Sequence, residues 1–298
     1  MKDKLTEWAY GAAWRLVRAL PESWAAGLFR AGADRAARKN GPSIQRLRGN
    51  LRRVVGEAVP EAEMDVLVRD GMRSYARYWL EAFRLPTMGH ETILDRFILD
   101  NYEVFDKHRE EGTGVIVALP HSGNWDLAGA WVCAKGYPIT TVAERLKPEA
   151  VYEKFLAFRR SLGMEIIPHA GGDRSPIDAL ADAIKERHVV PLLGDRDLSR
   201  RGVEVSFFGG RTRMPAGPGL LALRTGAPIY TVVVHNEGRI GRGELKGPVP
   251  IPTEGTQSER VAAITQYIAD DFAAGIAAHP ADWHMLQRMW LDKPGRPA

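Results

Sequence analysis

The sequence predicts an α/β fold: a central, mostly parallel β-sheet flanked by helices and preceded by N-terminal amphipathic helices. Short apolar runs rich in β-branched residues alternate with helical patterns through the middle of the chain, which is typical of parallel strands joined by helical crossovers. The chain has 298 residues, enough for one large domain or a domain with an extension. Hydrophobic residues make up 45% and charged residues 26%, which excludes a disordered chain.

Residues 1–60 are predicted to form basic amphipathic helices, the first of which ends at Pro21. Apolar side chains fall on one stripe of each helix, and basic side chains lie beside or opposite it. The stripe positions are Leu5, Trp8, Ala9, Ala12, Leu16, Ala19, Leu20, Trp24, Ala25, Leu28 and Phe29. Aromatic rings next to basic residues suit the headgroup layer of a membrane. Packing of the stripes on the rest of the fold is the alternative interpretation.

The charge of the chain is concentrated at this end. Residues 1–60 hold 12 of the 41 Lys and Arg and 5 of the 37 Asp and Glu, a net charge of +7, against −3 for the remainder. Such asymmetry indicates an anionic partner. No recognition-helix or zinc-ligand spacing accompanies the arginines, so we expect an anionic membrane surface and not nucleic acid. No run of about 18 apolar residues occurs that would span a bilayer.

The remainder of the chain is predicted to form the α/β domain, residues 61–298, with residues 1–60 as part of the same domain. A helix is expected from about 61 to 84. The predicted strands are Val115–Leu119, Ile139–Ala143, Met164–Pro168, Val189–Leu193 and Pro228–Val234. Helices are expected to about Lys135, over Glu149–Leu162, Ile177–Glu186 and Leu220–Leu223, and over 257–279. Ligands of such a sheet belong at the carboxyl ends of its strands.

The first predicted strand ends directly before His121, and Asp126 follows five positions later in the turn into the next helix. An imidazole titrates near neutrality and is the side chain most often used as a general base, so this is the expected catalytic position. A His at a strand tip can also be an ordinary polar residue. Cys133, the one cysteine, excludes an internal disulfide, favours a reducing compartment and is expected to be a small buried residue.

The motif His121-Ser-Gly-Asn-Trp-Asp126 resembles the His-x4-Asp signature of the glycerolipid acyltransferase superfamily. Five further segments occur in the order of one branch, the lipid A lauroyl/myristoyl acyltransferase family. They are Val142–Glu149, Gly194–Leu198, Gly202–Gly209, Met214–Pro218 and Ala281–Gln287. The resemblance covers nearly the whole chain. Within the family it is strongest to proteins that acylate phosphatidylinositol mannosides.

The resemblance implies transfer of an acyl group from a fatty acyl-CoA to a mannose hydroxyl of a phosphatidylinositol mannoside. Palmitoyl-CoA is the expected donor. The resemblance also implies peripheral attachment to the cytoplasmic face of the cell membrane, with acyl-CoA as co-substrate and no metal or resident cofactor. We expect a monomer, although the sequence leaves the oligomeric state open. His121 would be the general base, and no acyl-enzyme is needed because the hydroxyl attacks the thioester directly. Acyl-chain length and the acylated hydroxyl are left open, as is a different glycolipid or a lysophospholipid acceptor.

Two carboxylates compete to orient the imidazole, which needs such a partner to fix its tautomer. Asp126 belongs to the motif but is also placed to cap a helix. Asp195 follows the fourth predicted strand and so lies at the same sheet edge as His121. The related proteins are expected to carry Glu at this position, so the shorter Asp195 must approach more closely or act through water. The sequence leaves this choice open.

Substrate-binding residues are expected around this edge. Arginine forks recognise phosphate oxygens, and a CoA donor carries phosphates. The candidate arginines are Arg159, Arg196, Arg200, Arg201, Arg211, Arg213 and Arg224. The resemblance favours Arg159 among them, and it assigns Glu144 and His284 to acceptor binding. For most of the arginines, a solvated surface position is the alternative.

Other functions were weighed against this one. Asp195 and Asp197 form an Asp-x-Asp pair that would suit a metal-dependent glycosyltransferase, in which activity would not survive chelation. Residues 217–222 match a nominal G-x-G-x-x-A, but no strand precedes them, so a dinucleotide site is not expected. A non-enzymatic membrane scaffold using residues 1–60 is a further alternative, which acyl transfer by the purified protein would exclude.

Overall fold

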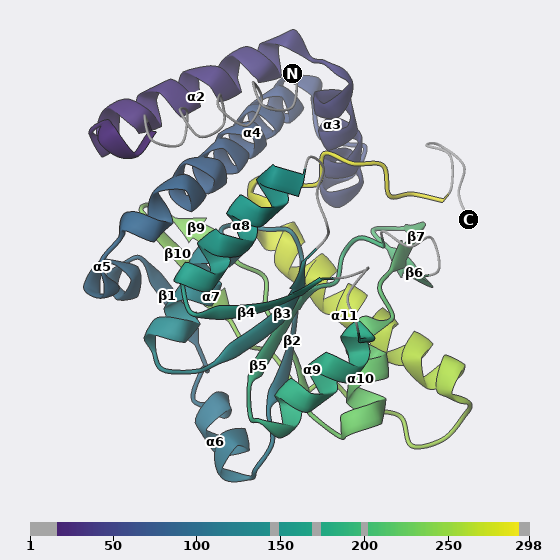
Figure 1. Ribbon diagram of the computed structural model, residues 1–298. Coiled ribbons are helices and arrows are strands. Elements are labelled where there is room, and N and C mark those ends of the chain that lie inside the picture. Colours follow the sequence, from purple (N-terminus) through teal and green to yellow (C-terminus); the bar gives the residue numbers. More distant parts are fainter. Residues whose placement is uncertain (1–16, 144–148, 169–173, 198–201, 292–298) are drawn as a thin grey trace.

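The computed structural model describes residues 17–143, 149–168, 174–197 and 202–291 (Figure 1). Within them the helices are α2 (Glu22–Lys39), α3 (Pro42–Val55), α4 (Glu61–Arg84), α5 (His90–Asp95), α6 (Val104–Glu110), α7 (Trp125–Ala134), α8 (Glu149–Ser161), α9 (Pro176–Lys185), α10 (Gly217–Thr225) and α11 (Gln257–Ala278). The strands are β1 (Phe97–Asp100), β2 (Val115–Leu119), β3 (Ile139–Ala143), β4 (Met164–Pro168), β5 (Val189–Leu193), β6 (Val203–Phe207), β7 (Gly210–Met214), β8 (Ile229–Thr231), β9 (His235–Glu237) and β10 (Ile240–Glu244).

A five-stranded, all-parallel sheet forms the centre of the protein, in the order β4-β3-β5-β2-β8 (Figure 1). The predicted α/β fold class is confirmed. Strands β2 to β5 begin and end at the predicted residues, whereas β8 covers only three of the seven residues predicted for it. Strand β2 lies between β5 and β8, and its carboxyl end lies at the edge of the sheet where ligands of parallel sheets bind.

Each face of the sheet has its own apolar core, because successive strand residues point to opposite sides. Val117 and Leu119 of β2 pack toward α7 and α8, together with β1. Ile116 and Ala118 pack toward α9, α10 and α11 on the other face. All four side chains are buried, and complete burial of an aliphatic side chain contributes about 1.5–3 kcal/mol.

A second, three-stranded sheet in the order β1-β10-β9 and the β6-β7 hairpin were not predicted. Strands β9 and β10 contain glycines and charged residues where an apolar alternation would have indicated strands. Two of the glycines allow close packing. A Cβ on Gly241 would lie 2.8 Å from the Phe97 ring, and one on Gly243 would lie 2.7 Å from a methyl of Val232. A side chain at either position would push these strands away from the main core.

Helices α2, α3 and α4 form a cap above the sheet (Figure 1). Leu47, Leu51 and Met64 are buried in a separate apolar cluster of this cap. Asp34 of α2 accepts hydrogen bonds from Arg73 of α4 at 2.6 and 2.9 Å, which joins the two helices along their length. The predicted N-terminal helices are present from residue 17 on. The stripe positions from Leu5 to Leu16 lie outside the described residues.

None of the helices in the described ranges combines the length and the apolar character needed to cross a lipid bilayer.

Candidate active site

The loop after β2 places His121 at the carboxyl edge of the sheet. Gly123 has a φ of +56°, and a Cβ there would lie 2.7 Å from the carbonyl oxygen of Val234, so only glycine fits this turn. Asn124 then caps α7, its side chain accepting the Leu127 N–H at 2.9 Å. The motif is therefore built as a tight turn and a helix cap that hold His121 above the sheet.

His121 and Asp195 form a hydrogen-bonded pair. His121 Nδ1 lies 2.6 Å from Asp195 Oδ1, and the His121 backbone N–H donates to Asp195 Oδ2 at 3.1 Å. Burial by itself raises the pKa of the fully buried Asp195, but the charge and hydrogen bonds of His121, together with the Trp283 N–H, outweigh it and hold the pKa below its usual value. The ionised carboxylate accepts the Nδ1 proton, which leaves the lone pair on Nε2. The imidazole is 26% exposed and so reaches a substrate.

Asp126 lies elsewhere. Its carboxylate is 2% exposed and accepts hydrogen bonds from Tyr78 Oη at 2.9 Å and Arg159 Nε at 2.8 Å. Burial raises the pKa of Tyr78 well above its usual value, and the charge of Asp126 raises it further. The geometry therefore joins His121 to Asp195, and it joins the motif carboxylate to Arg159. The shorter aspartate reaches the imidazole directly.

A pocket of about 310 Å³ opens beside this pair. Four of the predicted site residues line it: His121, Arg159, Arg196 and His284. Aromatic side chains of α4 and the Trp125 indole form much of the remaining wall. The indole of Trp125 also meets the His121 ring edge to face, with 5.4 Å between the ring centres. The pocket therefore combines two imidazoles, two guanidinium groups and flat aromatic faces.

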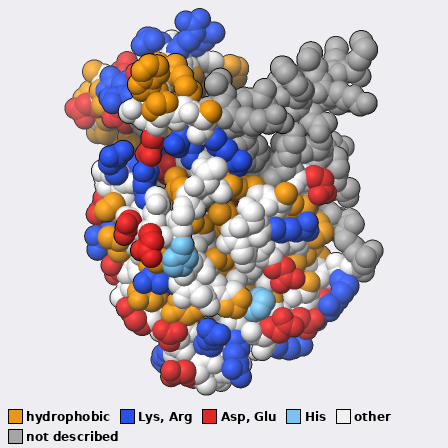
Figure 2. All heavy atoms as spheres, turned by 60° about the vertical axis from the view of Figure 1, so that its left-hand side comes forward, with side chains coloured by type: hydrophobic (Ala, Val, Ile, Leu, Met, Phe, Trp, Pro, Cys, Tyr) orange, Lys and Arg blue, Asp and Glu red, His pale blue; other side chains and the backbone are white. Residues whose placement is uncertain are grey.

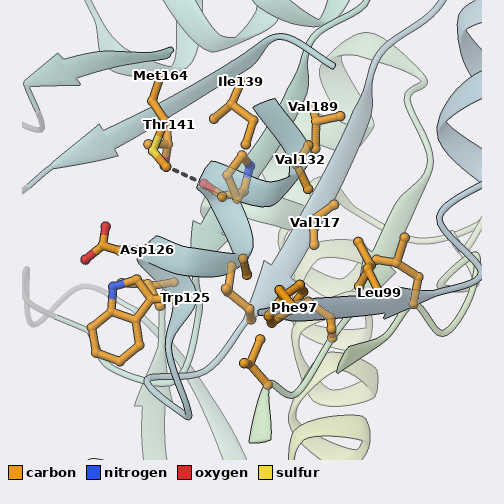
Figure 3. Close-up of a pocket in the computed structure, with 18 of the residues that line it drawn as sticks. Phe97, Leu99, Val117, Trp125, Asp126, Val132, Ile139, Thr141, Met164 and Val189 are labelled. Carbon is orange, nitrogen blue, oxygen red and sulfur yellow. Dashed lines mark hydrogen bonds between the residues drawn. The ribbon is translucent and has the colours of Figure 1, made fainter. Parts of the chain in front are cut away.

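An apolar cavity lies between α7 and the sheet (Figure 3). It extends from Leu119 and Leu193, at the carboxyl ends of their strands, to Val189 at the amino end, a depth of about 13 Å at 3.3 Å per strand residue. Trp125 and Arg159 line both this cavity and the pocket that contains His121. These two side chains are therefore shared walls of the two spaces, which lie next to each other.

His284 is buried in the pocket wall, and its hydrogen bonds fix its tautomer. Ser74 Oγ donates its single proton to the Asp282 carboxylate, so it accepts the bond from His284 Nε2 at 2.9 Å. Nε2 therefore carries the proton, and Nδ1 is an acceptor that finds no partner among the described groups. Burial lowers the pKa of His284 to about 4, so the ring is neutral at pH 7. Ser74 and Asp282 were not predicted from the sequence. Their role depends on the hydrogen bonds that link them to His284, which no sequence pattern indicates.

The other predicted site residues are placed differently. Arg224 is half-exposed and pairs with Asp178 outside the pocket, so it does not join the site. Glu144 and Arg201 lie outside the described residues. Arg224 was predicted from residue type alone, which does not distinguish a surface arginine from a pocket arginine.

Within the described residues, the carboxylates of the Asp-x-Asp pair are both engaged in hydrogen bonds. Both oxygens of Asp195 are hydrogen-bonded, and Asp197 accepts the Gly202 N–H at 2.8 Å. No group of three or more His, Cys, Asp or Glu side chains within the described ranges is arranged to bind a metal ion. The use of Asp195 by His121 is the arrangement that an acid–base site requires.

Comparison with known proteins identifies the family of the chain. A profile of the family described as "Bacterial lipid A biosynthesis acyltransferase" matches residues 1–292. A protein of Mycolicibacterium smegmatis named phosphatidylinositol mannoside acyltransferase is 48% identical over 97% of this chain and 92% of its own length. A protein of the same name from Mycobacterium tuberculosis is 49% identical over 96% of this chain and 89% of its own.

These matches confirm the resemblance found in the sequence and decide between the classes of function considered there. A profile match over 1–292 excludes the inert scaffold and the glycosyltransferase as interpretations of the chain. The chain belongs to the bacterial lipid A biosynthesis acyltransferase family and is an acyltransferase.

Proposed function

We propose that the protein transfers a palmitoyl group from palmitoyl-CoA to a mannose hydroxyl of a phosphatidylinositol mannoside, with His121 as the general base. The observation that carries this proposal is the position of the His121–Asp195 pair beside a polar pocket that shares walls with an apolar cavity. The acceptor class is taken from the names of the two mycobacterial relatives. Acylation of another glycolipid or of a lysophospholipid is the second candidate.

The chemistry requires one base and no acyl-enzyme. His121 Nε2 removes the hydroxyl proton as the oxygen attacks the thioester carbonyl carbon. The C–S bond then breaks, the imidazolium returns the proton to the sulfur, and the products are the ester and free CoA. Asp195 holds the tautomer and stabilises the imidazolium. General base catalysis of this kind contributes about 10²–10⁴ in rate.

The apolar cavity is proposed to hold the acyl chain. Its walls are the buried faces of β2, β3 and β5 and the side of α7, so an acyl chain there is removed from water (Figure 3). Burial of apolar surface contributes roughly 25 cal/mol per Å². The thioester would then lie between Trp125 and Arg159, the walls that the cavity and the pocket share, within reach of His121.

The pocket is proposed to hold the acceptor sugar. His284 Nδ1 is an unprotonated, buried acceptor in its wall and would receive a hydrogen bond from a sugar hydroxyl. Tyr75 and Trp79 supply flat apolar surfaces of the kind on which sugar rings stack. Arg196 is the described candidate for a phosphate contact, from the donor or the acceptor. Glu144 and Arg201 remain predicted binding residues.

We further propose that the protein, as a monomer, attaches peripherally to the cytoplasmic face of the membrane through its N-terminal helices. On α2, Trp24 and Leu28 are 70% and 63% exposed, although both are large and apolar. Apolar and basic side chains lie next to each other at the top of the molecule in Figure 2, over the N-terminal cap. Apolar side chains flanked by basic ones suit insertion into an anionic headgroup layer.

The direct test supplies the purified protein with a mixed glycolipid extract and acyl-CoAs from C12 to C18, and identifies the products by mass spectrometry. Palmitoyl esters of phosphatidylinositol mannosides are expected, with and without a metal chelator. Acyl transfer only to a lysophospholipid, or to a different glycolipid, would select the second candidate. Loss of activity on chelation would contradict a metal-free mechanism.

A further inference from the structure

The segment after α11 pairs with the catalytic loop as a short antiparallel strip. The Gly123 N–H donates to the Asp282 carbonyl at 2.9 Å, and the His284 N–H donates to the His121 carbonyl at 2.8 Å. Ser122 and Trp283 form an isolated β-bridge between these two bonds. Trp283 is thereby fixed under the loop and is completely buried.

The indole of Trp283 contacts the carboxylate that holds the catalytic imidazole. Asp195 Oδ1 faces His121 Nδ1, while Oδ2 accepts both the His121 backbone N–H at 3.1 Å and the Trp283 Nε1–H at 2.9 Å. The indole N–H therefore supplies one of the two donors that fix Oδ2, and it comes from the far end of the chain. Terminal carboxylate torsions are soft, so such donors determine the plane of the group.

We propose that Trp283 is a positioning residue for the acyl transfer, in which its indole N–H holds Asp195 Oδ2 so that Oδ1 remains directed at His121. The inference rests on the role of His121 proposed above. Without the indole donor, the Asp195 carboxylate would turn more freely about its side-chain bonds. The Nδ1–H bond would then be lost for part of the time, and the imidazole would sample the tautomer that carries its proton on Nε2, which cannot act as a base.

The same contact also affects the charge of the pair. The Trp283 N–H is one of the groups that hold the pKa of Asp195 below its usual value. Removing the indole N–H makes the Asp195 carboxylate more basic. Asp195 then stabilises the protonated form of the His121 imidazole more strongly. The acid limb of kcat/KM then moves to higher pH. The other ionisable groups around the pair are Asp282 and His284 in the same segment and the pocket residues Arg159 and Arg196, and none of them is altered by a change at 283.

The chain provides a matched control in Trp290. Its Nε1–H also donates to a buried oxygen, Asn50 Oδ1 at 2.8 Å. Both indoles lie against the Phe207 ring, with ring centres 6.0 and 6.1 Å away. Trp283→Phe and Trp290→Phe therefore remove the same donor from the same aromatic cluster. The pocket with His121 is not lined by Trp290.

The test compares wild type, Trp283→Phe and Trp290→Phe in pH profiles of kcat and kcat/KM for acyl transfer. Trp283→Phe is expected to lower the plateau of kcat by about tenfold, as loss of one hydrogen bond to a charged group allows, and to move the acid limb to higher pH. Trp290→Phe is expected to follow wild type. If Trp283→Phe does not fold, replacement of Trp283 by 3-benzothienylalanine keeps the ring shape and removes only the N–H.

A second measurement needs no substrate. In protein labelled with ¹⁵N-histidine, the His121 resonances, assigned from a His121→Gln sample, are followed through a pH titration. The titration midpoint is expected to rise in Trp283→Phe and to stay unchanged in Trp290→Phe. An unchanged midpoint together with an unchanged pH profile would overturn the proposal for Trp283. A shifted midpoint in a protein that acylates no glycolipid would instead contradict the proposed function and leave the contact between Trp283 and Asp195 supported.

Discussion

At the scale of single residues, the site separates two carboxylates that the sequence could not rank. Asp126 and Asp195 were both candidates to orient His121; Asp195 contacts the imidazole, whereas Asp126 accepts a hydrogen bond from Arg159. The choice between them depends on the direction in which α7 leaves the loop, which turns Asp126 toward Arg159. Tyr78 of α4 and Arg159 of α8 hold the Asp126 carboxylate there, and neither residue lies near the motif in the sequence.

The first residue-scale prediction concerns the base. His121→Gln is expected to lower kcat by about 10²–10⁴, because the hydroxyl would lose its proton acceptor. Binding of acyl-CoA should change little, since the apolar cavity does not include His121. Steady-state kinetics and calorimetric titration with a non-hydrolysable acyl-CoA measure the two effects. Turnover near the wild-type rate would show that His121 is not the base.

The second residue-scale prediction concerns stability at acid pH. Burial lowers the pKa of His284 to about 4, against about 6.5 for an exposed imidazole. Between these values the unfolded chain binds more protons, so the folded state loses stability as pH falls from about 6.5 toward 4, by up to about 3 kcal/mol. Urea unfolding at pH 7 and pH 4.5 measures this difference.

In His284→Gln, the loss of stability between these two pH values is expected to be smaller than in wild type. His90→Gln, a change at an exposed residue of α5, is the control and should retain the wild-type difference. An equal difference in all three proteins would contradict the buried, neutral state of His284.

At the scale of elements, the buried strands were predicted and the exposed ones were not. Strands β2 and β5 lie inside the sheet and read as continuous apolar runs. Strands β3 and β4 include Thr140, Thr141 and Glu165 but are otherwise apolar or β-branched. Strands β9 and β10 are short and contain charged or glycine residues, which the local sequence does not distinguish from loops. In β6, Val203, Val205 and Phe207 alternate with polar residues, a strand pattern that the prediction overlooked. Strand β1 matters for function because Phe97 and Leu99 line the apolar cavity.

Helix α7 carries the element-scale prediction. Gly129 lines the apolar cavity, and a Cβ there would lie 2.6 Å from the end of the Met164 side chain. Gly129→Val should fill part of the cavity and shift the acyl preference toward shorter chains. One methylene in an apolar pocket changes kcat/KM by roughly tenfold or more. Competition between C12 to C18 acyl-CoAs, with products measured by mass spectrometry, gives the preference.

Gly32→Val in α2 is the control for valine in a helix, because nothing lies within 4 Å of the added Cβ. It should leave the chain-length preference unchanged. If Gly129→Val retained the wild-type preference while folding normally, the acyl chain would have to lie outside this cavity.

At the scale of the whole molecule, the fold class and the position of the site followed from the sequence, whereas the contacts between distant segments did not. Helix α4 is the clearest case. It packs against α2 through Arg73 and Asp34 and also supplies Tyr75 and Trp79 to the pocket wall. One helix therefore joins the proposed membrane-facing surface to the proposed acceptor site, a relation that no local pattern predicts.

The whole-molecule prediction follows from this arrangement. Replacing Trp24 and Leu28 with Ser should weaken binding to anionic phospholipid vesicles by about tenfold per residue, given about 1.5–3 kcal/mol for burial of a large apolar side chain. The loss should be observed by vesicle sedimentation, and binding should also fall with salt. Tyr267→Ser on α11, which removes a 40% exposed ring from another surface, is the control. Unchanged binding of the double variant would leave α2 with a packing role only.

The strip formed by residues 282–284 has a consequence for biosynthesis. A ribosome delivers the chain from its amino end, so His121 and Asp195 emerge long before Trp283 reaches them. Until those last residues are released, the nascent chain has a sheet and a motif but an incompletely braced acid–base pair.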